Sequence, residues 1–157
     1  MVGGGEPKVV VLVTSFKDPP VLRDTLHSLL KTDYKNYEVI VVDCLSRSVR
    51  DLVEEIKRNS KVPIYYCSVS DNLGVASQLN YGLRLAVSFK NDAEYIARIE
   101  DDVILIDRLW LQKLVRVMKM YKDVEVAMPV SVTRSGKYAY CGGYLFGNGT
   151  ICSFDLY

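Results

Sequence analysis

The feature that most constrains the fold is a regular alternation between short apolar runs and segments with helical periodicity. The apolar runs at 8–13, 38–43, 62–69 and 94–99 contain many Val, Ile and Tyr residues. Such runs are typical of strands buried on both faces of a parallel sheet. Between the second and third runs, apolar residues recur at helical spacing, as Val49, Leu52, Val53 and Ile56. This alternation predicts an α/β protein with helices on both faces of a parallel sheet.

Turn residues and the C-terminal composition complete the predicted order of elements. Asp18-Pro19-Pro20 supplies an N-cap followed by helix-starting prolines. A further helix is expected over 107–121 and a fifth strand over 124–132. After Thr133 the sequence is rich in Tyr, Gly, Ser and Asn, which predicts a small β-rich part. The length of 157 residues predicts one domain, 1–157.

Composition and charge argue against several classes of protein. Twenty basic and nineteen acidic residues leave a net charge of +1 without a basic run, so no nucleic-acid partner is expected. The longest apolar run, Val9–Val13, is too short for a transmembrane helix, and the N-terminal residues do not resemble a secretory signal. Four cysteines without a CxxC pair, and a single histidine, argue against zinc. They predict free thiols and a cytoplasmic location.

Polar side chains gather where the predicted strands end. In an open parallel sheet, the carboxyl ends of the strands share one edge, and ligands bind there near the point where the strand order reverses. We therefore expect one polar rim, made by the residues that end or follow the first four strands, namely Thr14, Ser15, Asp43, Asn72, Glu100, Asp101 and Asp102.

Three consecutive carboxylates at this rim, residues 100–102, would repel one another unless a cation lies beside them. Mg²⁺ and Mn²⁺ prefer oxygen ligands, and Mg²⁺ often takes only one or two protein carboxylates together with phosphate oxygens and water. The bland alternative is a solvated acidic turn in which Asp102 caps a helix. The loop after the first strand contains neither G-x-G-x-x-G nor a Walker A motif, which argues against a dinucleotide or P-loop site.

The segments 11–16, 20–30 and 37–43 (VLVTSF, PVLRDTLHSLL and YEVIVVD) resemble the opening of family 2 glycosyltransferases. The triplet 72–74 with the triplet 80–82 (NLG and NYG) is similar to that family's N-x-G…N-x-G helix opening. Residues 100–102 stand where the family carries its D-x-D-type metal motif. The resemblance spans 8–132 and implies a Rossmann-like, mostly parallel sheet flanked by helices, the nucleotide-diphospho-sugar transferase fold, with a small β-rich C-terminal part.

The resemblance implies a donor site for a nucleoside diphosphate sugar, with UDP or GDP as carrier. Ser15 and Phe16 match the stretch beside the base and ribose, and Asp43 matches the carboxylate that contacts the base. Asp101 would face the ribose, and Asp102 would hold Mn²⁺ or Mg²⁺ on the diphosphate. The implied nucleotide-sugar-binding residues are Thr14, Ser15, Phe16, Asp43, Asn72, Glu100 and Asp101, with Asp102 as the metal ligand. Where the family often has a second Asp, this chain has Cys44.

The activity implied is metal-dependent, inverting transfer of the sugar to the hydroxyl of an acceptor glycan, lipid or protein. The family's catalytic base follows the fifth strand, but here only Asp155 follows Pro129 and it does not match, so no base is assigned. Family members are usually longer, which implies a short or C-terminally truncated member. In it, 8–132 would be the nucleotide-sugar-binding half and 133–157 a partial acceptor-side region. The alternative is a non-catalytic nucleotide-sugar-binding or assembly subunit, and the β-rich end is a candidate homodimer contact.

Overall fold

The computed structural model describes residues 5–69, 74–89, 92–140, 143–145 and 151–153. By its internal contacts the chain forms two compact units, Met1–Leu109 and Trp110–Tyr157, and each is described by itself. The expectation that 1–157 make up one glycosyltransferase-like domain stays a prediction. In the described part of the chain, no helix has the length and apolar character needed to span a bilayer.

The first unit is built on a parallel sheet of four strands, which confirms the predicted fold class. The strands are β1 (Val9–Ser15), β2 (Tyr37–Asp43), β3 (Ile64–Ser68) and β4 (Tyr95–Glu100). Their spatial order is β3-β2-β1-β4, with every neighbouring pair parallel. The order therefore reverses between β1 and β4, the position where open α/β sheets bind ligands.

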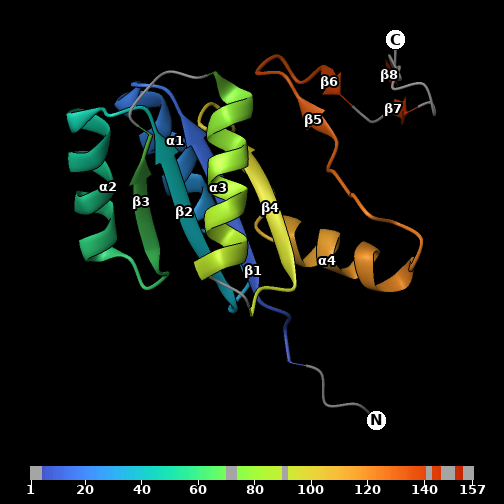
Figure 1. Ribbon diagram of the computed structural model, residues 1–157. Helices are drawn as coiled ribbons and strands as arrows, with labels where there is room; N and C mark the ends of the chain where they lie inside the picture. The colour runs from blue at the N-terminus through green and yellow to red at the C-terminus, as the bar shows by residue number, and fades with distance from the viewer. Residues whose placement is uncertain (1–4, 70–73, 90–91, 141–142, 146–150, 154–157) are drawn as a thin grey trace. The chain divides into compact units, whose positions relative to one another are not determined.

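Three helices of this unit connect the strands, and they cover both faces of the sheet (Figure 1). They are α1 (Pro19–Leu29), α2 (Arg47–Asn59) and α3 (Val75–Phe89). Helix α3 packs on β1 and β2, whereas α2 contacts α1 and β3. Because α3 returns the chain from β3 to the far side of β1, it lies on the face opposite α1 and closes the core from that side.

The core sits on β1 and β2, as continuous apolar runs require. All seven residues of β1 are buried, and the face toward α3 contains a cluster of Val10, Leu12, Ile40, Val42 and Ala86. Gly82 of α3 allows this close approach. A Cβ added at Gly82 would lie 2.4 Å from Leu12 Cδ1, closer than real Cβ contacts, and 3.1 Å from Val42 Cγ2, which is a tight contact.

The first helix begins as its sequence predicts, with an N-cap and prolines at its start. The Asp18 carboxylate accepts a hydrogen bond from Val21 N at 3.3 Å, with prolines at the first two helical positions. The first strand ends later than expected. Thr14 and Ser15 do not follow the first strand but are its last two residues, paired with Val42 and Asp43 of β2. They are therefore buried ladder residues.

The second unit contains α4 (Trp110–Met120) and two antiparallel strand pairs. The first pair joins β5 (Ser131–Val132) to β6 (Tyr138–Tyr140), and the second joins β7 (Gly143–Leu145) to β8 (Ile151–Ser153). The β-rich C-terminal part is thus present. The prediction of a fifth strand over 124–132 is wrong for 124–130, which pair with no other strand. Apolar alternation needs a partner strand, and here Val126 is 84% exposed.

We expect Gly82→Val to destabilise the chain, because the new side chain would overlap the fully buried Leu12 in a core that cannot expand freely. Overpacking of this kind costs about 1–3 kcal/mol. Urea denaturation followed by circular dichroism measures the loss. The matched control is Tyr81→Val, which places the same side chain at an exposed neighbouring position of α3. Equal stability of the two variants would contradict the close packing of α3 on β1.

Candidate functional site

The loop after β1 is held between two carboxylates from the strands on either side. Phe16 N donates to Asp101 Oδ2 at 3.1 Å, and Lys17 N donates to Asp43 Oδ1 at 3.2 Å. Asp43 ends β2, and Asp101 directly follows β4. The strand order β2-β1-β4 is what places the two acids on opposite sides of this loop. The loop therefore presents Phe16, which is 49% exposed, with Lys17 Nζ 5.5 Å from the ring centre.

Asp43 is fully buried, and both of its carboxylate oxygens accept hydrogen bonds. Besides Lys17 N, the donors are Ser46 N at 2.9 Å and the Tyr66 hydroxyl at 3.3 Å. The loops that it holds each contain a residue with positive φ, Lys17 at 57° and Leu45 at 42°. This left-handed conformation costs a non-glycine residue roughly 1–2 kcal/mol, and charge-assisted hydrogen bonds offset such a cost. Asp43 thus organises two loops at the sheet edge.

A buried amide joins the ends of β1 and β2 from the helix that follows. Gln78 of α3 donates to Ser15 O at 3.1 Å and to Cys44 Sγ at 2.8 Å. Gln78 and Cys44 are both buried. The Ser15 hydroxyl is also buried and has no hydrogen-bond partner among the described residues. Cys44 stands where the family that the sequence resembles often has a second Asp. Through the contact with Gln78, Cys44 helps to hold this edge together.

The acidic turn after β4 is attached to α1. The Thr25 hydroxyl donates to the carbonyl oxygen of Asp101, and Leu105 N donates to Ser28 Oγ at 3.0 Å. Thr25 is fully buried. Together with the bond from Phe16 N to the Asp101 carboxylate, these contacts hold the turn next to the β1 loop.

The three consecutive carboxylates have different surroundings. Glu100 is paired with Arg98, two residues earlier on β4, and Asp101 is engaged by Phe16 N. Asp102 is exposed and makes no hydrogen bond or ion pair to any described residue. No cluster of three or more potential metal ligands occurs in the described ranges. The exposed Asp102 carboxylate still suits a cation that takes most of its ligands from phosphate and water. Asp101 lies beside it and uses only Oδ2 in the bond with Phe16 N.

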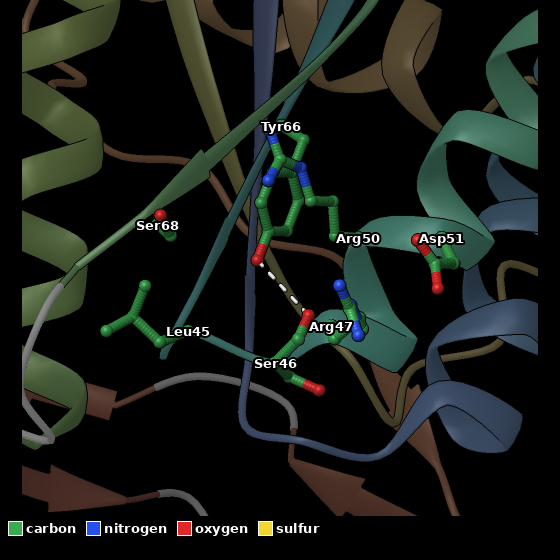
Figure 2. A pocket seen from close by; sticks show the side chains of 7 residues that line it. All are labelled: Leu45, Ser46, Arg47, Arg50, Asp51, Tyr66 and Ser68. Carbon is green, nitrogen blue, oxygen red and sulfur yellow. Dashed lines mark hydrogen bonds between the residues drawn. The ribbon is translucent and has the colours of Figure 1, made fainter.

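A pocket of ≈ 390 Å³ opens at the same edge, between β2, β3 and the start of α2 (Figure 2). Tyr66 and Ser46 line it, and the Tyr66 hydroxyl bonds both the carbonyl of Ser46 and the Asp43 carboxylate. Arg47 and Arg50 bring positive charge from α2, and neither forms an ion pair within the described ranges. The remaining lining residues are Leu45, Asp51 and Ser68. The pocket is thus a polar hollow that shares Tyr66 and Ser46 with the network around Asp43.

The structure brings most of the predicted rim together at one edge of the sheet, and one predicted residue is not among those that it describes. Asp43 and Asp101 contact the same loop, and Asp102 follows directly, whereas Asn72 lies outside the described residues. Sequence reasoning missed three contributors to the site, Thr25, Tyr66 and Gln78. The sequence pattern places each of them inside a predicted helix or strand. The available signal was their polarity at positions where the apolar pattern predicts burial.

Comparisons with known proteins find a family and a relative that match this chain. A sequence model described as Glycosyl transferase family 2 matches residues 10–140. TuaG of Bacillus subtilis (strain 168), named as a teichuronic acid biosynthesis glycosyltransferase, is 26% identical over 99 residues, which are 62% of this chain and 36% of that protein. This chain therefore spans about a third of the relative's length.

Two solved structures share the fold of this chain. The mannosyltransferase PcManGT from Pyrobaculum calidifontis, in complex with GDP-Man and Mn²⁺, has a TM-score of 0.65 at 23% identity, covering 73% of this chain and 33% of that one. S. aureus TarS 1-349 in complex with UDP-GlcNAc has a TM-score of 0.61 at 23% identity, covering 73% of this chain and 32% of that one. At these identities the likeness establishes the fold and confirms the predicted α/β architecture.

We expect Asp43→Asn to destabilise the chain although the side chain keeps its shape. A neutral amide has one acceptor oxygen, and its NH₂ group would face a donor such as Lys17 N or Ser46 N. Hydrogen bonds to a charged group contribute about 1.5–3 kcal/mol each, so the expected loss is about 2–4 kcal/mol in urea denaturation. Asp24→Asn, at an exposed carboxylate on α1, should change stability little. A stable Asp43→Asn protein would contradict the organising part given to Asp43.

Tyr66 provides a pH-dependent test of the same network. Burial, and then the negative charge of Asp43, raise the pKa of Tyr66 from 10.0 to about 12. A raised folded-state pKa gives stability that is present below pH 10 and is lost as pH rises toward about 12. The stability difference between the wild type and Tyr66→Phe should therefore shrink from pH 9 to pH 11.5, measured by urea denaturation. Other tyrosines contribute equally to both proteins, so a constant difference would be contrary to this assignment.

Proposed function

The chain belongs to glycosyl transferase family 2, and from that premise we propose that its sheet edge binds a nucleoside diphosphate sugar for transfer to an acceptor hydroxyl. The observation that carries the proposal is the pair of hydrogen bonds by which Asp101 and Asp43 hold the β1 loop at Phe16 N and Lys17 N, which we call the clamp. It groups Phe16, Asp43 and Asp101 with the neighbouring Asp102 at the point where the strand order reverses. Relatives of similar fold are in complex with GDP-Man and Mn²⁺ or with UDP-GlcNAc, which supports this class of ligand.

The dimensions of the edge suit an elongated ligand. Neighbouring strands lie about 4.8 Å apart, so the pocket between β2 and β3 lies about 12 Å from β4 along the edge. An extended nucleoside diphosphate can bridge such a separation, with the nucleoside at the pocket and the phosphates toward Asp102.

The proposed binding residues divide by exposure. Thr14, Ser15 and Asp43 are buried, so their contribution is to support the walls, with Asp43 holding the loops on either side. Phe16, Glu100 and Asp102 are exposed, and Asp101 is half-buried, so these can touch a ligand directly. Phe16 offers a ring for stacking against a base or ribose. Asn72 is kept in the proposal from the resemblance alone.

The donor set fits Mn²⁺ or Mg²⁺ held through Asp102, with Asp101 beside it. Such an ion, when bound, stabilises the negative charge that develops on the departing diphosphate. The chain's own residues then have simpler tasks. Phe16 and the clamped loop orient the nucleotide, and Asp102 supplies the protein ligand to the metal. Orientation of this kind accounts for a large part of the rate in such transfers.

In the proposed reaction, the acceptor hydroxyl attacks the anomeric carbon as the bond to the diphosphate breaks, with inversion at that carbon. The proton of the hydroxyl passes to a general base, for which no residue is assigned. A donor-binding or assembly subunit without its own base is therefore the second candidate. Sugar transfer or donor hydrolysis by the chain would favour the enzyme, whereas donor binding without turnover across a broad acceptor panel would favour the subunit.

The cytoplasmic location expected from the sequence also remains a proposal. Its support is that neither Cys44 nor Cys67 forms a disulfide, as expected in a reducing compartment. We also propose, from the sequence alone, that the acceptor is a glycan, lipid or protein and that the C-terminal β region forms a homodimer contact.

We expect Asp102→Ala to remove the metal dependence of nucleotide binding. In the wild type, Mn²⁺ should tighten binding of UDP or GDP, measured by isothermal titration calorimetry with Mn²⁺ or with EDTA. Loss of a direct carboxylate ligand should weaken Mn²⁺-dependent binding by at least about tenfold.

The control for this experiment is Asp24→Ala, an exposed carboxylate on α1, which should bind as the wild type does. Binding of both UDP and GDP that ignores Mn²⁺ and the Asp102 substitution would refute the metal assignment. Absence of binding by the wild type to either nucleotide would refute the donor site itself.

A further inference from the structure

The turn that carries Asp102 has little structure of its own. Asp101 and Asp102 form a turn directly after β4, and the chain that follows over 103–107 is neither helix nor strand. Isolated turns of this kind sample several conformations. The position of Asp102 therefore depends on the side chains that hold the turn from outside.

Two hydroxyl groups of α1 hold the turn on both sides of Asp102. The Thr25 hydroxyl donates to the carbonyl oxygen of Asp101, immediately before it, and Ser28 Oγ accepts from Leu105 N at 3.0 Å, three residues after it. Ser28 Oγ also donates to the carbonyl oxygen of Thr25 at 2.8 Å. Since a hydroxyl can donate once and accept as well, these contacts form one continuous chain from the helix to the turn.

The placement of the two hydroxyls is not explained by the helix alone. Thr and Ser are only moderate helix formers, and Thr25 occupies a fully buried position between buried leucines of α1. A buried hydroxyl without a partner is costly, and the carbonyl of Asp101 supplies the partner. Residues 25 and 28 are three apart, so they lie on the same side of the helix and reach the two ends of the turn together.

We propose that Thr25 and Ser28 are positioning residues that set the place of Asp102 for the diphosphate-bound cation. The proposal rests on the donor site proposed above and adds to it the part of α1. Metal and substrate contacts work only when their ligands are held to within about 0.5 Å. The two hydroxyls restrict the turn before and after Asp102. Removing either hydroxyl therefore lets the Asp102 carboxylate move.

The test measures Mn²⁺ affinity in the presence of saturating UDP or GDP, by electron paramagnetic resonance of free Mn²⁺, on the full chain. Thr25→Val keeps the branched shape without the hydroxyl, and Ser28→Ala removes the second hydroxyl at a half-buried position. Each substitution should weaken Mn²⁺ binding about three- to tenfold, the effect of one hydrogen bond. Thr25→Ser, which retains the hydroxyl, should restore affinity to within about twofold of the wild type.

Ser60→Ala separates positioning from general stability. Ser60 exchanges hydrogen bonds with Val62 between α2 and β3, at the opposite edge of the sheet. Its loss should lower thermal stability without changing Mn²⁺ affinity. Unchanged Mn²⁺ affinity in folded Thr25→Val and Ser28→Ala, with Asp102→Ala still defective, would overturn the positioning proposal alone. A wild type that binds neither nucleotide with Mn²⁺ would overturn the proposed function, and this inference with it.

Discussion

Two acidic side chains, one on each side of the central strand, hold the backbone of the loop on which the candidate site depends. Asp43 and Asp101 accept hydrogen bonds from consecutive amide groups, Lys17 N and Phe16 N. A loop that leaves a buried strand has amides without ladder partners, and a carboxylate satisfies them with stronger bonds than a neutral group. The strand order makes the arrangement available, since β1 lies between the two strands that supply the acids.

At this sheet edge, the buried residues support the loops, and the exposed residues are the ones that a ligand can touch. Asp43, Gln78 and Thr25 are buried, and their polar atoms are committed to the chain's own backbone or neighbours. Phe16 and Asp102 remain exposed. An unpaired polar group in a low-dielectric interior is costly, so the paired buried residues act as a framework that keeps the exposed residues in place. The pocket beside Tyr66 adds a concave surface to the same framework.

The sequence predicts the sheet well because its signals are local and repeated. Continuous β-branched runs such as 9–13 fold as buried strands, and the Asp18-Pro19-Pro20 signal starts a helix where expected. The segment 124–130 also contains many apolar residues but forms no strand. The difference is physical: a strand needs a neighbouring edge for its hydrogen bonds, and an apolar pattern cannot specify whether one is available.

The sequence by itself determined the α/β class, the family and the gathering of acidic residues at one edge, because parallel strands necessarily end together. Only the tertiary structure decided which acid does what. It buries Asp43 among three donors, engages Asp101 with the β1 loop and leaves Asp102 exposed. It also brings Thr25, Tyr66 and Gln78 to the edge, although they are distant in sequence from the residues they hold. Hydrogen bonds across such separations depend on how helices pack on the sheet, which no local pattern encodes.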